Sequence, residues 1–219
     1  MLARASGPVL IAVALALSAC GGGVGVGGPS TATDKALDVP PQAELMADGP
    51  LGERVLGKPN APVTVIEYVS LTCPHCANFQ KNLFARVKKE FIDTGKVRFI
   101  VREFPIGHTS GTAAIINRCA PEDKYFFLLN QFLTRQPEWV SQEVRPDAIY
   151  SVAKSSGLSR AEFDKCATNQ TIINGLTEVK QRGRKFGVVG TPTFFANGRK
   201  AQGNITFEEF KALLGSSST

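Results

Sequence analysis

Two cysteines separated by two residues, Cys73 and Cys76, constrain this chain more than any other feature. The run before them, residues 63–69, is almost continuously apolar and rich in β-branched residues, which predicts a buried central strand. The run after them predicts a helix, because its large apolar residues fall on one face at helical spacing. These residues are Phe79, Leu83, Phe84, Val87 and Phe91. The cysteines therefore stand where a strand ends and a helix begins.

A cysteine at the start of a helix is favoured as the thiolate. The first amide groups of a helix lack internal partners and its dipole is positive at that end, so the pKa of Cys73 should be lowered. His75 can add a hydrogen-bond donor or a positive charge nearby. Each unit of lowering favours the thiolate by about 1.4 kcal/mol. Because a stable thiolate is a good leaving group, a Cys73–Cys76 disulfide should be oxidising and readily reduced.

Two other interpretations of the cysteine pair are weaker. A zinc site needs four ligands, whereas the chain has no second close cysteine pair and only two histidines, so no metal site is predicted. A purely structural disulfide at this spacing would close a very small, strained ring, which makes the bond labile. We therefore predict redox chemistry at Cys73 and Cys76, with no bound cofactor.

Glu67 lies inside the predicted buried strand, six residues before Cys73. A carboxylate in an apolar strand is unfavourable without a partner, so its pKa should be raised. Such a group suits the transfer of a proton to or from Cys76. The alternative is an acid at the end of the strand that reaches water. His75 has a similar alternative, an exposed turn histidine without a role.

The N-terminus is predicted to lie outside the fold and to direct export. Residues 1–19 have the pattern of a lipoprotein signal peptide, with Arg4 before an apolar segment too short to span a bilayer. Leu17-Ser18-Ala19-Cys20 resembles a bacterial lipobox, in which the cysteine is lipidated. The alternative is ordinary cleavage nearby, which leaves Cys20 as a free thiol. Five cysteines leave one unpaired, which favours lipidation at Cys20.

Residues 20–52 are rich in Gly, Pro, Ala, Ser and Thr, which is typical of a flexible tether. Residues 96–104 form a second strand pattern, and residues 109–186 then favour several packed helices. Cys119 and Cys166 fall in this helical block. In an oxidising compartment they are expected to form a second disulfide, worth about 4 kcal/mol in the entropic description; the alternative is two buried free thiols. Neither is assigned a catalytic role.

Strand signals return at residues 190–196, where Pro192 follows Thr191 and is a candidate for a cis peptide bond. Asn197-Gly198 predicts a hairpin turn, and Thr206 with Glu209 predicts the capped start of a final helix. The net charge of +6 does not indicate nucleic-acid binding, because export removes that partner and no aromatic residues interleave the charges. By default the basic residues form a solvated face, and attraction to an anionic membrane surface or to acidic clients is a modest addition.

Taken together, these motifs resemble the DsbA family of thiol:disulfide oxidoreductases over roughly Arg54 to Leu214. The segments that carry the resemblance are Gly57–Val63, Glu67, Cys73–Cys76 and Gly190–Phe194. The resemblance implies an α/β thioredoxin fold made of residues 53–108 and 187–219, with the helical domain 109–186 inserted between them. Cys119 and Cys166 are similar in placement to the extra disulfide of an alphaproteobacterial branch.

The resemblance also implies a role for each site residue. Cys73 is the exposed nucleophile, Cys76 its buried partner, and Glu67 a buried acid beside Cys76. Pro192 is cis and faces the disulfide, and Thr191 offers backbone hydrogen bonds to a client peptide. A DsbB-like membrane protein is implied as the reoxidant.

We therefore expect a monomeric disulfide oxidase of the bacterial cell envelope, lipid-anchored in the periplasm, whose clients are exported proteins with free thiols. Two alternatives remain open. One is a reductase or isomerase on the same scaffold, since a threonine before the proline, like Thr191 here, also occurs in such enzymes. The other is a non-enzymatic, tethered chaperone that grips extended peptides at Pro192. We expect His108 to lie in a loop and assign it no role.

Overall fold

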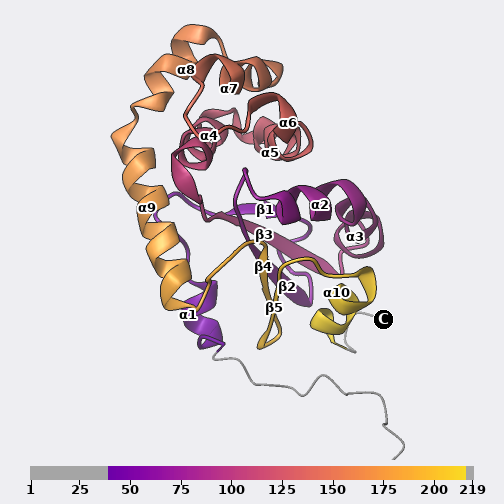
Figure 1. Cartoon of the computed structure of the whole chain (residues 1–219). Helices are drawn as coiled ribbons and strands as arrows, with labels where there is room; N and C mark the ends of the chain where they lie inside the picture. Colours follow the sequence, from indigo (N-terminus) through magenta and orange to yellow (C-terminus); the bar gives the residue numbers. More distant parts are fainter. Residues whose placement is uncertain (1–38, 216–219) are drawn as a thin grey trace, which may run out of the picture. The chain divides into compact units, whose positions relative to one another are not determined.

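The computed structural model describes residues 39–215. The predicted signal peptide, Cys20 and residues 21–38 of the predicted tether lie outside the described residues. A five-stranded sheet with strand order β1-β3-β2-β4-β5 forms the centre (Figure 1). Strands β2 and β3 are parallel, and the other neighbours are antiparallel. The strands are β1 (Arg54–Leu56), β2 (Val63–Val69), β3 (Val97–Glu103), β4 (Thr193–Ala196) and β5 (Arg199–Gln202).

Helices cover both faces of the sheet and form the connection between β3 and β4. A π-helical turn, Lys88–Ile92, follows α3, and short 3₁₀ turns lie at Glu122–Lys124 and Lys154–Ser156. The α-helices are α1 (Gln42–Met46), α2 (Pro74–Asn82), α3 (Phe84–Val87), α4 (Gly107–Cys119), α5 (Tyr125–Thr134), α6 (Gln136–Trp139), α7 (Pro146–Ala153), α8 (Arg160–Ala167), α9 (Gln170–Lys185) and α10 (Phe207–Leu214).

The alternation of side chains along β2 divides the core into two layers. Val65 and Val69 belong to the layer that includes α2, α10 and the helices between β3 and β4. Ile66 and Tyr68 belong to a smaller layer with Leu45 of α1. All five apolar residues predicted to share the face of the helix after the cysteines lie in or against the larger layer. The central strand is therefore buried on both sides, as its apolar run predicted.

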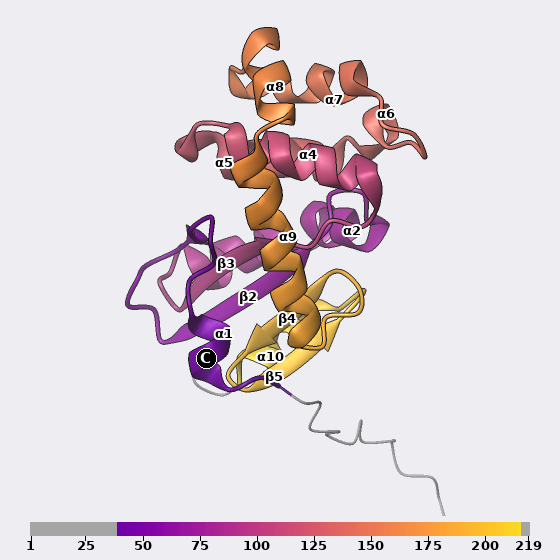
Figure 2. The same ribbon diagram turned by 90° about the vertical axis from the view of Figure 1, so that its left-hand side faces the viewer.

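The helices α4 to α9 form the inserted helical domain between β3 and β4, which confirms the predicted fold class. Helix α9 runs from this domain back to the sheet (Figures 1 and 2). Local signals mark the boundaries well: Ser159 and Thr206 both form the predicted capping boxes. The hairpin is also confirmed, with positive φ at both Asn197 and Gly198. Two boundaries differ from the prediction. Strand β4 begins at Thr193, three residues after the start of the predicted strand signal. Helix α4 begins at Gly107, so His108 lies in its first turn rather than in a loop.

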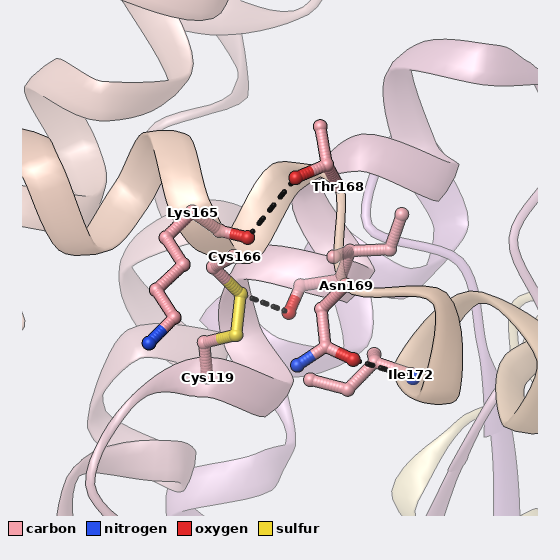
Figure 3. Close-up of a disulfide and its surroundings, with 7 residues drawn as sticks. Cys119, Lys165, Cys166, Thr168, Asn169 and Ile172 are labelled. Carbon is pink, nitrogen blue, oxygen red and sulfur yellow. Dashed lines mark hydrogen bonds between the residues drawn. A yellow bond between two sulfur atoms is a disulfide. The ribbon is translucent and has the colours of Figure 1, made fainter.

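A disulfide joins Cys119 at the end of α4 to Cys166 in α8 (Figure 3). The two Cα atoms are 6.2 Å apart, and the sequence separation is 47 residues. Beside it, Arg118 donates to Glu103 of β3 through Nε at 2.5 Å and Nη2 at 2.6 Å. The hydroxyl of Tyr125 donates to the same carboxylate at 2.7 Å. This buried cluster ties the helical domain to the sheet.

The prediction of a flexible tether is wrong for residues 39–52, which pack against the sheet. Leu45 is buried, and Arg102 of β3 donates to its carbonyl oxygen at 2.9 Å while pairing with Glu53 at 2.7 Å. Arg182 of α9 donates to the carbonyl oxygen of Glu44 in α1 at 2.6 Å and to that of Asp48, just after α1, at 3.0 Å. Carbonyl groups at the end of a helix lack internal partners, and the two arginines supply them. Composition alone did not reveal these distant donors.

Within residues 39–215, no helix is both long enough and apolar enough to cross a membrane.

Candidate active site

Cys73 is the N-cap of α2, four residues after the end of β2. Pro74 occupies the first helical turn, where its missing N–H leaves no helical hydrogen bond unmade. Cys73 is half-buried and Cys76 is buried, and both are free thiols in this structure. The strand-to-helix junction predicted from the sequence therefore leaves Cys73 partly accessible to solvent and holds Cys76 inside the core.

The pKa of Cys73 is lowered from 9.0 to about 5. The largest cause is a hydrogen bond from the Cys76 thiol; the Thr191 hydroxyl and the amides of Cys76 and His75 add to it, and burial opposes them. In the thiol form, Cys73 donates to the Thr191 carbonyl oxygen at 3.1 Å. The Thr191 hydroxyl is buried and has no hydrogen-bond partner among the described residues, so it can donate once the thiolate forms.

Cys76 shows the opposite behaviour. Burial raises its pKa well above 9.0, and the hydrogen bond to Cys73 and the negative charges of Glu67 and Cys73 raise it further. The reduced site therefore holds one thiolate and one thiol at neutral pH, with the proton on Cys76. Because the thiolate is the reactive form of cysteine, this separation favours Cys73 over Cys76 as a nucleophile and leaving group.

Glu67 lies on β2 opposite Val101 of β3 and Phe194 of β4. It is buried, and desolvation followed by the negative charge of Cys73 raises its pKa to about 8. The alternative of an acid that reaches water does not fit this burial. A carboxyl group that is mostly protonated at pH 7 can give a proton to a neighbouring sulfur and take it back. That role stays a prediction.

The peptide bond between Thr191 and Pro192 is cis. The Thr191 carbonyl lies against Cys73, although the two residues are 118 positions apart in the sequence. His75 is exposed on the first turn of α2. The structure therefore brings Cys73, Cys76, Glu67, Thr191 and Pro192 together, whereas His75 contributes its amide and its side chain points to solvent. Among residues 39–215, no group of three or more His, Cys, Asp or Glu side chains could hold a metal ion.

Gln136 of α6 is a site residue that the sequence did not indicate. Its Nε2 donates to the carbonyl oxygens of Leu71 at 2.7 Å and of Cys73 at 3.0 Å. Ser110 of α4 accepts from the Leu71 amide at 3.2 Å. The helical domain thus holds the backbone of the turn that carries Cys73. These contacts join residues more than 35 positions apart, and a single glutamine or serine in a helix gives no local signal of them.

Replacing Gln136 with leucine is expected to lower the free energy of unfolding by about 1–2 kcal/mol, because two part-buried carbonyl groups lose their donor. Urea unfolding of the oxidised protein measures this. The matched control is Gln142→Leu, at an exposed position whose side chain makes no hydrogen bond within the described part of the chain. If both variants unfold alike, Gln136 does not hold the turn.

Comparison with known proteins relates this chain to thioredoxin-like proteins that carry out disulfide chemistry. Residues 51–216 match the family model described as Thioredoxin. A Rickettsia conorii protein named as a protein-disulfide oxidoreductase is 35% identical over 166 residues, which cover 74% of this chain and 59% of that protein. The chain thus spans about three fifths of the length of this relative. Disulfide bond formation protein D of Bacillus subtilis is 27% identical, with 74% of this chain and 76% of that protein covered.

Among solved structures, alpha-DsbA1 of Wolbachia pipientis is similar with a TM-score of 0.68 and 28% sequence identity. The match covers 75% of this chain and 92% of that chain. The likeness therefore includes both the sheet and the inserted helices.

Proposed function

The chain belongs to the thioredoxin family in its DsbA-like form, and we propose that it introduces disulfide bonds into exported proteins through Cys73 and Cys76. The observation that carries this proposal is the separation of the two cysteine pKa values, with Cys73 lowered to about 5 and Cys76 raised well above 9.0. A site that stabilises its reduced form in this way favours the uptake of electrons from client thiols.

The proposed reaction begins with the disulfide between Cys73 and Cys76. A client thiolate attacks the Cys73 sulfur, the Cys73–Cys76 bond breaks, and its electron pair goes to Cys76. Glu67, with its raised pKa, supplies the proton that Cys76 takes up. A mixed disulfide between the client and Cys73 results.

In the second step, another client thiolate attacks the client sulfur of the mixed disulfide. Cys73 leaves as a thiolate, stabilised by Cys76, Thr191 and the first amides of α2. The client gains one disulfide, and the protein has accepted two electrons. Turnover then needs an external oxidant, for which the family resemblance suggests a DsbB-like membrane protein. Export and lipid attachment at Cys20 belong to the same proposal.

The equilibrium of the Cys73–Cys76 pair with glutathione tests this proposal. We expect a reduction potential above about −200 mV, in the range of oxidising members of this fold. A value near that of thioredoxin, about −270 mV, would support a reductase instead. Oxidation of a reduced, unfolded client by a stoichiometric amount of the oxidised protein should accompany the higher potential.

A further inference from the structure

A groove of about 600 Å³ lies between α4 and α9, in the region where α9 passes α4 in Figure 2. Helix α4 contributes His108, Gly111 and Ile115 to its lining. Helix α9 contributes Leu176, Lys180 and Arg184. None of the cysteines or the other residues of the active site lines this groove.

The lining combines an apolar surface with positive charge. Ile115 and Leu176 are among its apolar residues, and Lys180 and Arg184 supply two cations, whereas no Asp or Glu lines it. Neither cation forms an ion pair with another residue in the range 39–215. Burial and the charge of Arg184 lower the pKa of Lys180. The Lys180 ammonium group donates to the Pro105 carbonyl oxygen at 2.6 Å. Because no carboxylate neutralises either cation, a negative charge brought into the groove would still be stabilised by both.

Gly111 lines the groove and has no side chain to project into it. It lies inside α4, and a Cβ atom added there would meet no other atom within 4 Å. A glycine within a helix is less stable than alanine by about 1 kcal/mol, and packing in the described part of the chain gives no reason for it. Glycine is typical where another chain or a ligand approaches a backbone closely.

The lining of the groove is connected to the active-site turn. Pro105 and Gly107 belong to that lining. Ile106, between them, donates its amide to Ser70 at 3.2 Å and accepts a hydrogen bond from Thr72 at 3.4 Å. Thr72 directly precedes Cys73. Along α4, residues 107–115 extend about 12 Å, enough for three or four residues of an extended peptide.

We propose that this groove binds the segment of a client polypeptide close to its reacting cysteine, and that it selects segments with an acidic residue beside a large aliphatic one. Charge complementarity to Lys180 and Arg184 and continuity with the turn at Cys73 support this occupant. The inference rests on the proposed function, since it names the class of client that the oxidase prefers.

Reduced peptides with two cysteines test the preference. One peptide carries Leu-Glu-Glu on both sides of the cysteines, and its partner carries Leu-Lys-Lys. Single-turnover oxidation by the oxidised full-length protein should be about five-fold or more faster for the acidic peptide at low salt. Arg184→Glu should lower the ratio of the acidic-peptide rate to the basic-peptide rate most of the way to one. Lys185→Glu is the matched control, because Lys185 is exposed and next in α9 but does not line the groove.

Blocking the groove tests the aliphatic part. Gly111→Trp should slow oxidation of the acidic peptide about five-fold, whereas Gly111→Ala should retain most of the rate. Oxidation of dithiothreitol, which is too small to reach the groove from Cys73, should be unchanged in every variant. Equal ratios for Arg184→Glu and Lys185→Glu, or no effect of Gly111→Trp, would overturn the inference and leave the oxidase intact. Failure of the unaltered protein to oxidise dithiothreitol would overturn the proposed function, and this inference with it.

Discussion

Replacing Cys73 with serine is expected to lower disulfide transfer to reduced clients at least about 10³-fold, to the level of the uncatalysed reaction. A hydroxyl group cannot form the disulfide that accepts the client's electrons, and Cys76 is too buried to replace Cys73. The measurement is the rate of disulfide formation in a reduced, unfolded client, with urea unfolding to show that the variant folds.

Cys76→Ser is the matched variant, because it removes the partner and keeps the Cys73 sulfur. It should also fail to oxidise clients, but it should form a mixed disulfide with oxidised glutathione at Cys73. The same pair of variants separates an enzyme from a chaperone. If Cys73→Ser retains the full effect of the protein on its clients, peptide binding rather than redox chemistry is the activity.

The second large effect is a pH-dependent difference in stability between the reduced and oxidised protein. Between pH 5 and 9, the folded reduced protein holds a thiolate at Cys73, whereas the unfolded chain holds a thiol with a pKa near 9.0. The unfolded state then binds more protons, so the free energy of unfolding rises with pH in this window. At pH 7 the free energy of unfolding of the reduced protein should exceed that of the oxidised protein by about 1–3 kcal/mol, after discounting for the solvent exposure of Cys73.

Below pH 5 both states carry the thiol, and this contribution is lost. Glu67 acts in the other direction: its pKa is about 8 when folded and near 4.5 when unfolded, so stability falls as pH rises between these values. Because desolvation, the larger cause of this shift, does not depend on the charge of Cys73, comparing the two redox forms should remove most of the Glu67 effect. Urea unfolding of each form at pH 4.5, 6 and 7.5 measures the difference. A difference that stays constant over this range would contradict an activated Cys73.

The local parts of the fold were predictable because their signals lie in short stretches of sequence. The apolar run of β2, the turn at Asn197-Gly198 and the capping boxes at Ser159 and Thr206 each depend on neighbouring residues. The cysteine pair likewise indicated its own site, because the strand and helix that position it are adjacent in sequence. The family resemblance then supplied the arrangement of the distant parts.

The parts that could not be predicted depend on long-range contacts. Strand β1 has only three residues, too few to show a period, and it exists because β3 offers it a partner. Residues 39–52 look like a linker in composition, yet Arg102 and Arg182 hold them in place. Gln136 supports the active-site turn across more than 60 positions. In each case the partner lies elsewhere in the chain, so no local pattern records it.

The last two residues of β3 point to opposite faces of the sheet and carry opposite charges. Arg102 is held by Glu53 and α1 on one side, and Glu103 by Arg118 and Tyr125 on the other. Shifting the register of β3 by one residue would move Arg102 and Glu103 to the opposite faces of the sheet. Each charge would then be buried without its partner, which costs several kcal/mol per charge. The two neighbouring charges thus specify the register of β3. Apolar side chains of similar shape would not provide this specificity.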